Sequence, residues 1–161
     1  MRETLALLEP QLRSAQVAVE TELDDRLPPI HGDSGKLQQV LLNLFFNARD
    51  AMPQGGRLTI RTRARAVDGG GRVRVEVADT GIGIAADHLS KIYDPFFTTK
   101  TTGRGTGLGL AITYGIIQEH SGSIQVRSQP GQGTTFILDF PVPAAVAAQA
   151  PPRAGQAGEN G

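Results

Sequence analysis

Residues 33–52, with the sequence DSGKLQQVLLNLFFNARDAM, carry the pattern on which the fold prediction depends. Asp33 and Ser34 can cap the start of a helix, and Pro53 with the glycines that follow it ends the helix near Met52. Apolar residues at helical spacing predict one buried stripe, made of Leu37, Val40, Leu41, Leu44, Ala48 and Ala51. A second stripe is polar and consists of Lys36, Gln39, Asn43, Asn47 and Asp50.

The polar stripe has two possible meanings. Asn43 and Asn47 lie one turn apart, although asparagine is unfavourable inside a helix because its side chain competes for backbone hydrogen bonds. The stripe is either a solvated helix face or a polar strip that faces a ligand. In the second case the amide oxygens are hard donors suited to Mg²⁺, which takes its other ligands from water and phosphate oxygens.

The rest of the chain predicts a single α+β domain. Further helices are expected at 4–16, 89–93 and 107–120, and strands at 17–23, 57–67, 72–78, 123–128 and 134–140. Because hairpins dominate the order, we expect a mixed sheet with helices on one face. The domain should end at residue 142, and the Pro/Ala/Gly-rich segment 143–161 should be a disordered tail.

Composition excludes several classes of function. The 16 basic and 16 acidic residues cancel, so no basic excess points to a nucleic acid partner. The chain has no Cys, which excludes a disulfide framework, a thiolate metal site and a thiol nucleophile. It also has no apolar run near the roughly 20 residues that span a bilayer. We therefore expect no nucleic acid, no direct membrane contact, and a monomeric isolated domain in a cytoplasmic setting.

Two glycine-rich segments follow the predicted helix. Asp79 to Gly83 comes directly after a predicted strand, where the glycines let the backbone turn beside a bound group; a plain turn closed by Asp79 is the alternative. Gly103 to Gly109 leads into a helix, where free N–H groups favour phosphates; a flexible linker is the alternative. Between them, residues 95–106 should form a mobile loop whose Phe96 and Phe97 are core plugs or loop anchors.

Taken together and in order, these segments resemble the four boxes of sensor histidine kinase catalytic domains. Residues 43–48 resemble the N box, 79–83 the first glycine box, 95–100 the F box and 105–109 the second glycine box. The Pro-Phe-Phe-Thr-Thr-Lys form of the F box is most similar to nitrogen-regulation-type kinases. The superfamily includes gyrase, Hsp90 and MutL, and the resemblance covers roughly residues 4–142.

The resemblance implies a fold and a ligand. The fold is a two-layer α/β sandwich, the Bergerat fold, with about five strands covered on one face by about three helices. The ligand is ATP or ADP with Mg²⁺, held by Asn47 as the metal ligand, and Asn43, Asn47 and Lys100 are the implied catalytic residues. Asp79 would accept a hydrogen bond from the adenine amino group. The implied nucleotide-binding residues are Asn43, Asn47, Asp50, Asp79, Gly81, Gly83, Ile84, Phe97, Thr98, Lys100, Arg104, Gly105, Thr106, Gly107, Leu108, Gly109 and Thr135.

Two positions depart from related patterns. Many sensor kinases carry Lys where this chain has Asp50, so Lys100, Arg104 or Arg49 is left to supply positive charge to the phosphates. Superfamily ATPases place Glu, as the base, where this chain has Asn43. An amide cannot take a proton from water, whereas a neutral histidine acceptor needs less help. Asn43 therefore favours phosphoryl transfer to histidine over hydrolysis.

The phosphoacceptor is not evident in the chain. None of His31, His88 and His120 is followed by an acidic residue, and we expect all three to be structural or solvated. The acceptor histidine would then lie on a dimerisation domain outside the chain, with a response regulator downstream. Two other functions stay open: an ATP-hydrolysing switch of the gyrase or Hsp90 type, and a binding module whose nucleotide site has decayed.

Overall fold

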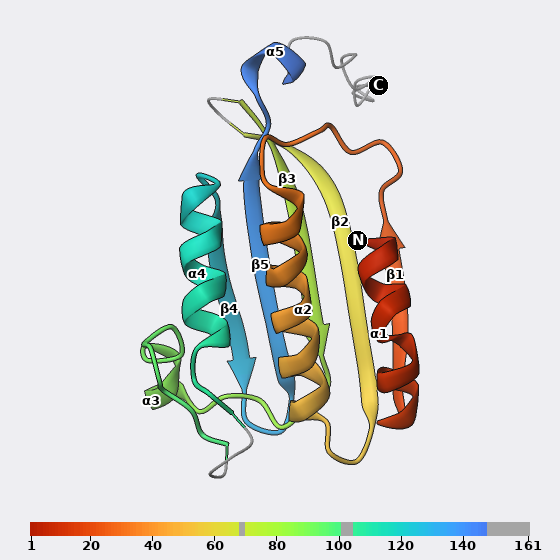
Figure 1. The fold of residues 1–161 in the computed structure, drawn as a ribbon, viewed down its shortest axis with the longest axis vertical. Coiled ribbons are helices and arrows are strands. Elements are labelled where there is room, and N and C mark those ends of the chain that lie inside the picture. Colours follow the sequence, from red (N-terminus) through yellow and green to blue (C-terminus); the bar gives the residue numbers. More distant parts are fainter. Residues whose placement is uncertain (68–69, 101–104, 148–161) are drawn as a thin grey trace, which may run out of the picture.

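Five strands form one sheet in the part of the chain that the computed structural model describes, residues 1–67, 70–100 and 105–147. The strands lie in the order β1-β2-β3-β5-β4 (Figure 1), with β1 parallel to β2 and the other pairs antiparallel. The sheet is therefore mixed, as predicted. The strand bounds are β1 Val17–Leu23, β2 Gly56–Val67, β3 Gly70–Asp79, β4 Ser123–Gln129 and β5 Gly133–Pro141.

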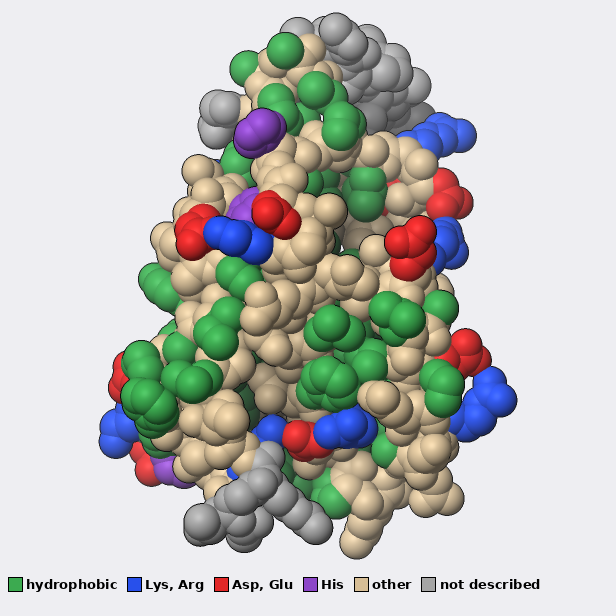
Figure 2. Space-filling model, in the orientation of Figure 1, with side chains coloured by type: hydrophobic (Ala, Val, Ile, Leu, Met, Phe, Trp, Pro, Cys, Tyr) green, Lys and Arg blue, Asp and Glu red, His purple; other side chains and the backbone are tan. Residues whose placement is uncertain are grey.

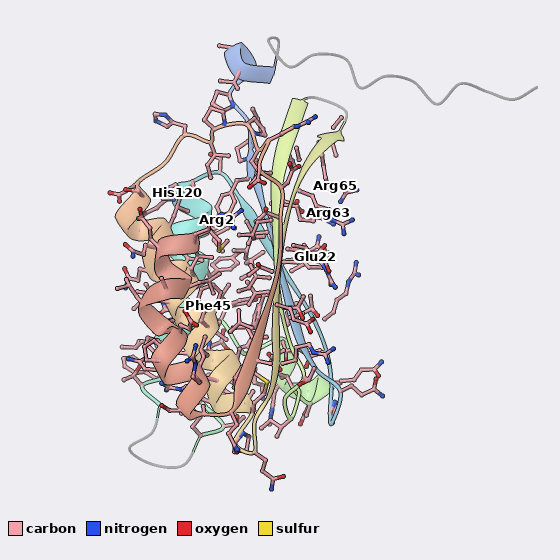
Figure 3. All side chains as sticks on the ribbon, turned by 90° about the vertical axis from the view of Figure 1, so that its right-hand side faces the viewer. Arg2, Glu22, Phe45, Arg63, Arg65 and His120 are labelled. Atoms are coloured by element: carbon pink, nitrogen blue, oxygen red, sulfur yellow. The ribbon has the colours of Figure 1, made fainter. Side chains whose placement is uncertain are left out.

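Three long helices cover one face of this sheet and leave the other face to solvent, as the front and side views show (Figures 1 and 3). They are α1 Arg2–Ser14, α2 Ser34–Ala51 and α4 Gly109–Glu119. Two short helices, α3 Ala86–Leu89 and α5 Ala144–Ala147, lie at the ends of the sheet. The α+β prediction of a sheet covered on one face is confirmed. No helix among the described residues has the length and apolar character that crossing a bilayer requires.

The core lies between the sheet and the three long helices, which all contribute buried residues to it. Alternate residues of β2 and β5 point inward, so Leu58, Ile60, Phe136 and Leu138 are buried. Phe45 of α2 is fully buried in the same cluster (Figure 3), although the sequence analysis left it off the apolar stripe. Burying one such side chain contributes roughly 1.5–3 kcal/mol to folding.

The N-terminus of α2 is fixed by two contacts. The Asp33 side chain accepts a hydrogen bond from the backbone N–H of Lys36 at 3.0 Å, which confirms the predicted cap. The Asp33 N–H in turn donates to Nε2 of His120 at 2.9 Å, while Nδ1 of His120 lies 2.7 Å from the carbonyl of Ile116. His120 therefore joins the end of α4 to the start of α2, a structural role that agrees with the prediction.

Some element boundaries differ from the prediction. The helix expected from Gly107 starts at Gly109, because Gly107 has a φ of +69° and cannot be helical. The short helix expected at 89–93 lies earlier, at Ala86–Leu89, and Ile92 instead packs into the core from the turn that follows.

The start of the predicted tail also differs. Val142 donates its N–H to the carbonyl of Gly71, and the helical turn α5 follows directly where disorder was expected. The remainder of the predicted tail, 148–161, lies outside the described residues, as do loop residues 101–104.

Candidate functional site

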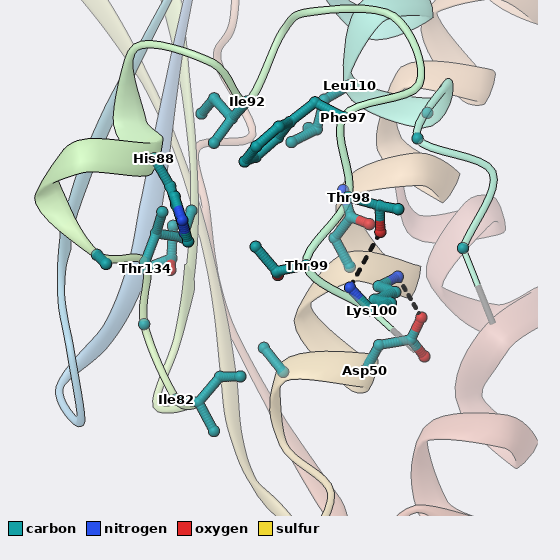
Figure 4. A pocket seen from close by; sticks show the side chains of 18 of the residues that line it. Asp50, Ile82, His88, Ile92, Phe97, Thr98, Thr99, Lys100, Leu110 and Thr134 are labelled. Carbon is teal, nitrogen blue, oxygen red and sulfur yellow. Dashed lines mark hydrogen bonds and ion pairs between the residues drawn. The ribbon is translucent and has the colours of Figure 1, made fainter. Parts of the chain in front are cut away.

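One cavity of about 820 Å³ opens between α2, α3, the ends of β3 and β5, and the start of α4 (Figure 4). Its wall brings together segments that are far apart in the sequence, and most of the predicted site residues belong to it. Those residues are Asn47, Asp50, Asp79, Gly83, Ile84, Phe97, Thr98, Lys100, Gly105, Thr106, Gly107 and Gly109.

Asp79 lies at one end of the cavity, at the last position of β3. Its Oδ1 accepts hydrogen bonds from the N–H of Gly81 at 2.8 Å and from the N–H of Thr134 at 3.3 Å. Burial raises the pKa of the Asp79 carboxyl, although both hydrogen bonds act in the opposite direction. Oδ2 accepts no hydrogen bond from the described residues, so one carboxylate oxygen of a half-buried group is available to a ligand donor.

The walls beside Asp79 are apolar. Ile84, Ala85 and Phe136 line the cavity near the ends of β3 and β5, and Ile92 is another apolar residue in its wall. A flat aromatic ring with a polar edge fits such a slot, because its faces meet apolar side chains while its edge meets the carboxylate.

The opposite end of the cavity is polar and charged. Asn47 and Asp50 lie one turn apart on α2, and Nζ of Lys100 donates to Oδ2 of Asp50 at 2.6 Å (Figure 4). Arg49 donates to Oδ1 of Asp50 from Nε and Nη2, at 3.0 and 2.8 Å. Burial alone would raise the pKa of Asp50, but the hydrogen bonds from Lys100 and Arg49 outweigh it and lower that pKa.

The N-terminus of α4 also faces this end of the cavity. Gly109 and Leu110, its first two residues, line the wall, and among the described residues no side chain caps the helix; its first turn holds no acid. Its free N–H groups and the positive end of its dipole therefore suit an anion. Oγ1 of Thr106 accepts a hydrogen bond from the N–H of Leu108 at 3.3 Å, and this bond orders the backbone just before α4 begins.

Two glycines in the wall are required by the backbone. Gly83 has a φ of +73°, and a Cβ on it would collide with the carbonyl of Gln129. Gly107 has a φ of +69°, and a Cβ there would collide with the backbone of Phe96. Both positions need glycine for two reasons. A residue with a side chain is strained in the left-handed backbone conformation, and its Cβ would also collide with the nearby backbone.

Four predicted residues lie outside the cavity wall. Nδ2 of Asn43 donates to the carbonyl of Gly109 at 3.1 Å and to Oγ1 of Thr113 at 3.3 Å, so Asn43 links α2 to α4. Gly81 is buried behind Asp79, and Leu108 precedes the first turn of α4. Thr135 points to the other face of the sheet, because side chains alternate along β5 and Thr134 takes the cavity position. Arg104 lies outside the described residues.

The two adjacent phenylalanines of the F box differ in role. Phe97 lines the cavity and packs on the core, with its ring 5.5 Å from that of His88. Phe96 is 74% exposed and has a φ of +68°, which is unusual for a residue with a side chain. Phe97 therefore packs against the core as expected, whereas the side chain of Phe96 is neither a core residue nor an anchor that packs on it.

Sequence reasoning missed several residues of the cavity wall. His88 was expected to be structural or solvated, yet it faces the cavity beside Phe97 (Figure 4). No motif marks His88, and only the fold brings α3 against the loop. The other residues in the wall that the sequence analysis did not assign to the site are Ala51, Ile82, Ala85, Ile92, Thr99, Leu110, Pro130, Thr134 and Phe136.

The donor set at the polar end is compatible with Mg²⁺ bound through a polyphosphate. Asn47 contributes an amide and Asp50 a carboxylate, both hard oxygen donors on one turn of α2. Among the described residues, no cluster of three or more His, Asp or Glu forms a metal site by itself. A metal here would take most of its ligands from a nucleotide and water.

Residues 32–144 match the family described as histidine kinase-, DNA gyrase B-, and HSP90-like ATPase, and the chain belongs to this family. It is 41% identical over 142 residues to Sporulation kinase E of Bacillus subtilis (strain 168), covering 88% of this chain and 19% of that protein. The chain therefore spans about a fifth of that relative.

Solved structures agree with this assignment. Full-length ShkA in complex with AMPPNP superimposes with a TM-score of 0.74 at 35% identity, over 87% of this chain and 28% of that one. Histidine kinase ThkA in complex with the response regulator TrrA superimposes with a TM-score of 0.71 at 30% identity, over 88% of this chain and 39% of that one. The fold and family expected from the four boxes are thus confirmed.

Proposed function

We propose that this chain is the ATP-binding catalytic domain of a sensor histidine kinase, which transfers the γ-phosphoryl group of ATP to a histidine outside the chain. One observation carries the proposal: a single cavity has a half-buried carboxylate, Asp79, at one end and the uncapped N-terminus of α4 at the other. This pairing suits a nucleotide, which has a polar-edged ring at one end and phosphates at the other.

At the base end, Asp79 selects adenine. Its free oxygen accepts the hydrogen bond that the 6-amino group of adenine donates. Guanine places a carbonyl oxygen at that position, which would leave two acceptors facing each other. Apolar residues such as Ile84 and Phe136 contact the faces of the ring.

At the phosphate end, backbone N–H groups of Gly105, Gly107 and Gly109 face the phosphates, and Thr98 and Thr106 add hydroxyl donors. Asn47 holds Mg²⁺, which neutralises phosphate charge when it is bound. Lys100 lies close enough to this end to exchange its contact with Asp50 for one with a phosphate oxygen.

Transfer to histidine fits this site better than hydrolysis. The position where the superfamily's ATPases carry a base is Asn43, and its amide is engaged by Gly109 and Thr113. Neither an amide nor a hydroxyl at these positions can take a proton from water at neutral pH. A neutral imidazole attacks with its own lone pair, so positioning and charge neutralisation suffice.

The partners follow from this reaction. The acceptor histidine lies on a dimerisation domain of the same parent protein, and a response regulator receives the phosphoryl group from it. The ThkA complex with its response regulator supports the second step. ATP as donor, together with the absence of Cys from the sequence, supports a cytoplasmic location for the domain.

Binding and transfer can be tested separately. Calorimetric titration with ADP and Mg²⁺ should show one site per chain, and Asn47→Ala should remove the Mg²⁺-dependent part of the affinity without unfolding the protein. Incubation with γ-labelled ATP should leave the chain unlabelled until a dimerisation domain is added. Steady phosphate release by the chain alone would favour the hydrolytic switch, and absence of adenine nucleotide binding would favour a decayed site.

A further inference from the structure

The face of the sheet that the helices leave open carries arginine and no lysine. Leu58, Ile60 and the alternate residues of the other strands point into the core, so the intervening residues point outward. The basic residues at outward positions are Arg57, Arg61, Arg63, Arg65, Arg72, Arg74 and Arg127. Figure 3 shows Arg63 and Arg65 projecting from this face beside Glu22, and Figure 2 shows that the helix-covered face also carries charges of both signs.

Four of these arginines form a block of like charge. In the β2–β3 register Arg63 lies opposite Arg74, and Arg65 lies opposite Arg72. Like charges directly opposite each other on neighbouring strands destabilise a sheet. We call these four residues the arginine block.

Only two of the four arginines in the block have an ion-pair partner among the described residues. Arg74 makes a two-point contact with Asp139, at 2.9 and 2.6 Å, and Nη2 of Arg63 lies 3.6 Å from Glu22. Among the described residues, neither Arg65 nor Arg72 has an ion-pair partner.

The positions of Arg65 and Arg72 explain this lack of partners. Arg65 lies beyond the end of β1, whose pairing stops at Leu23 with Thr62, and the neighbour of Arg72 on β5 is Pro141. Among the described residues, the sheet thus holds two facing guanidinium groups that have no ion-pair partner, although the carboxylates of Asp24 and Glu76 line the same hollow as Arg65.

We propose that the arginine block is a docking surface for an acidic surface of another protein or domain. Charge complementarity supports the choice, because the planar guanidinium binds a carboxylate through two hydrogen bonds. A bound carboxylate would also supply the ion-pair partner that Arg65 and Arg72 lack among the described residues. The chain spans only about a fifth of Sporulation kinase E, so a parent of similar length would contain other domains to provide such a surface.

A protein partner fits better than a nucleic acid or a bilayer. Asp24 and Glu76 line a hollow of about 530 Å³ together with Arg63, Arg65 and Arg74, so this end of the sheet presents separate arginines among carboxylates and not the continuous basic surface that a phosphate backbone requires. Outward positions of the described strands hold no aromatic side chain for base stacking or for anchoring in a membrane interface.

The docking surface is separate from the nucleotide cavity. Arg72 and Asp79 are seven residues apart along β3, about 23 Å, and they lie at opposite ends of the strand. Variants of the arginine block should therefore leave ADP affinity unchanged. If the wild-type chain itself did not bind ADP, that result would contradict the proposed function but not the docking surface.

The first test is the stability of the double variant Arg65→Gln/Arg72→Gln. Removing the facing charges should raise its thermal midpoint by about 2 °C at low salt, and the gain should shrink at about 0.5 M salt. The matched control, Arg57→Gln/Arg127→Gln, removes the same charge from the other end of the face, where Arg57 is paired with Glu20 at 3.1 Å. An equal gain in the control, or none in the double variant, would overturn the claim of local repulsion.

The second test is binding of a fluorescein-labelled glutamate-rich peptide, followed by anisotropy. The wild-type chain should bind it, the Arg65→Gln/Arg72→Gln variant should lose roughly fivefold in affinity, and the control should change by less than about twofold. An equal loss of peptide affinity in both variants would show that the peptide is attracted by the overall positive charge of the face, and it would contradict a docking surface at the arginine block. Tighter block-dependent binding of a DNA oligomer or of phosphatidylserine vesicles would overturn the choice of a protein partner.

Discussion

Lys100 of the F box and Asp50 of α2 form a 2.6 Å ion pair across the mouth of the cavity. The pair joins the loop to the helix at the end of the cavity where phosphates are expected. Asp50 also stands where many sensor kinases carry a lysine, so this chain has placed the positive charge on the loop and an acid on the helix. A phosphate that enters must compete with Asp50 for Lys100.

Asp50→Asn should therefore increase affinity for ATP measured without Mg²⁺. The substitution removes a negative charge near the phosphates and releases Lys100, and we expect a gain of about threefold to tenfold from weaker repulsion in a partly exposed site. Calorimetric titration measures it, with Asp94→Asn, an exposed acid outside the cavity wall, as the control. A lower affinity in Asp50→Asn than in wild type would show that Asp50 contributes to binding directly.

Asn43→Ala should reduce stability more than it reduces binding. The amide donates to Gly109 and to the fully buried Thr113, so its loss leaves two acceptors unsatisfied and should cost about 1–2 kcal/mol. Urea unfolding measures the change, and Gln39→Ala, an exposed residue one turn earlier on the same helix, should cost little. If Asn43→Ala kept full stability but abolished nucleotide binding, Asn43 would belong to the site and not to the α2–α4 link.

Gly107→Ala should disturb the loop and weaken nucleotide binding. A methyl group there meets the backbone of Phe96 at a φ of +69°, which should cost about 1–3 kcal/mol. Gly115→Ala is the matched control, because this glycine lies in α4 with open space around it and the change should stabilise the helix by about 0.5–1 kcal/mol. Equal nucleotide affinity in the two variants would contradict the role given to Gly107.

The raised pKa of Asp79 predicts the pH dependence of binding. Because burial makes the carboxyl take up a proton at a higher pH than the usual 3.8, adenine nucleotide affinity should begin to fall earlier on acidification than an ordinary aspartate would allow. The stability of the free protein should depend on pH in the opposite direction. Burial disfavours the ionised form of Asp79, so the stability contributed by the protonated carboxyl is lost as pH rises through the raised pKa.

Asp79→Asn isolates this group. The phosphates of the nucleotide titrate in the same way with the variant and with the wild type. The difference between the two profiles of ADP affinity against pH therefore reports the ionisation of Asp79 alone. We expect the wild-type ADP affinity to fall more steeply toward low pH. Parallel profiles would show that the carboxylate does not contact the bound nucleotide.

The sequence was sufficient to predict the framework of the fold and most of the cavity wall. The apolar stripe on α2 and the alternation of apolar and polar residues on β2 predict which side chains are buried. Glycines such as Gly83 and Gly107 indicate backbone turns in which a side chain would collide with a neighbouring segment. These signals are local, because each depends on the spacing of residues within one segment.

The placements that the sequence did not predict are those in which the position of a side chain depends on a distant segment. The cavity position on β5 belongs to Thr134 and not to Thr135, because pairing with β3 sets which face each residue takes. His88 reaches the cavity because α3 packs beside the loop that carries Phe97. Asn43 donates to Gly109 and Thr113 of α4, a contact that neighbouring residues on α2 do not determine.

The most direct measurement for the central claim is a crystal structure of the chain with AMPPNP and Mg²⁺. The account predicts the 6-amino group of adenine within hydrogen-bonding distance of Asp79, the phosphates at the N-terminus of α4, and Mg²⁺ on the amide oxygen of Asn47. A purine bound away from the end of β3, or phosphates bound away from Gly105 to Gly109, would contradict it.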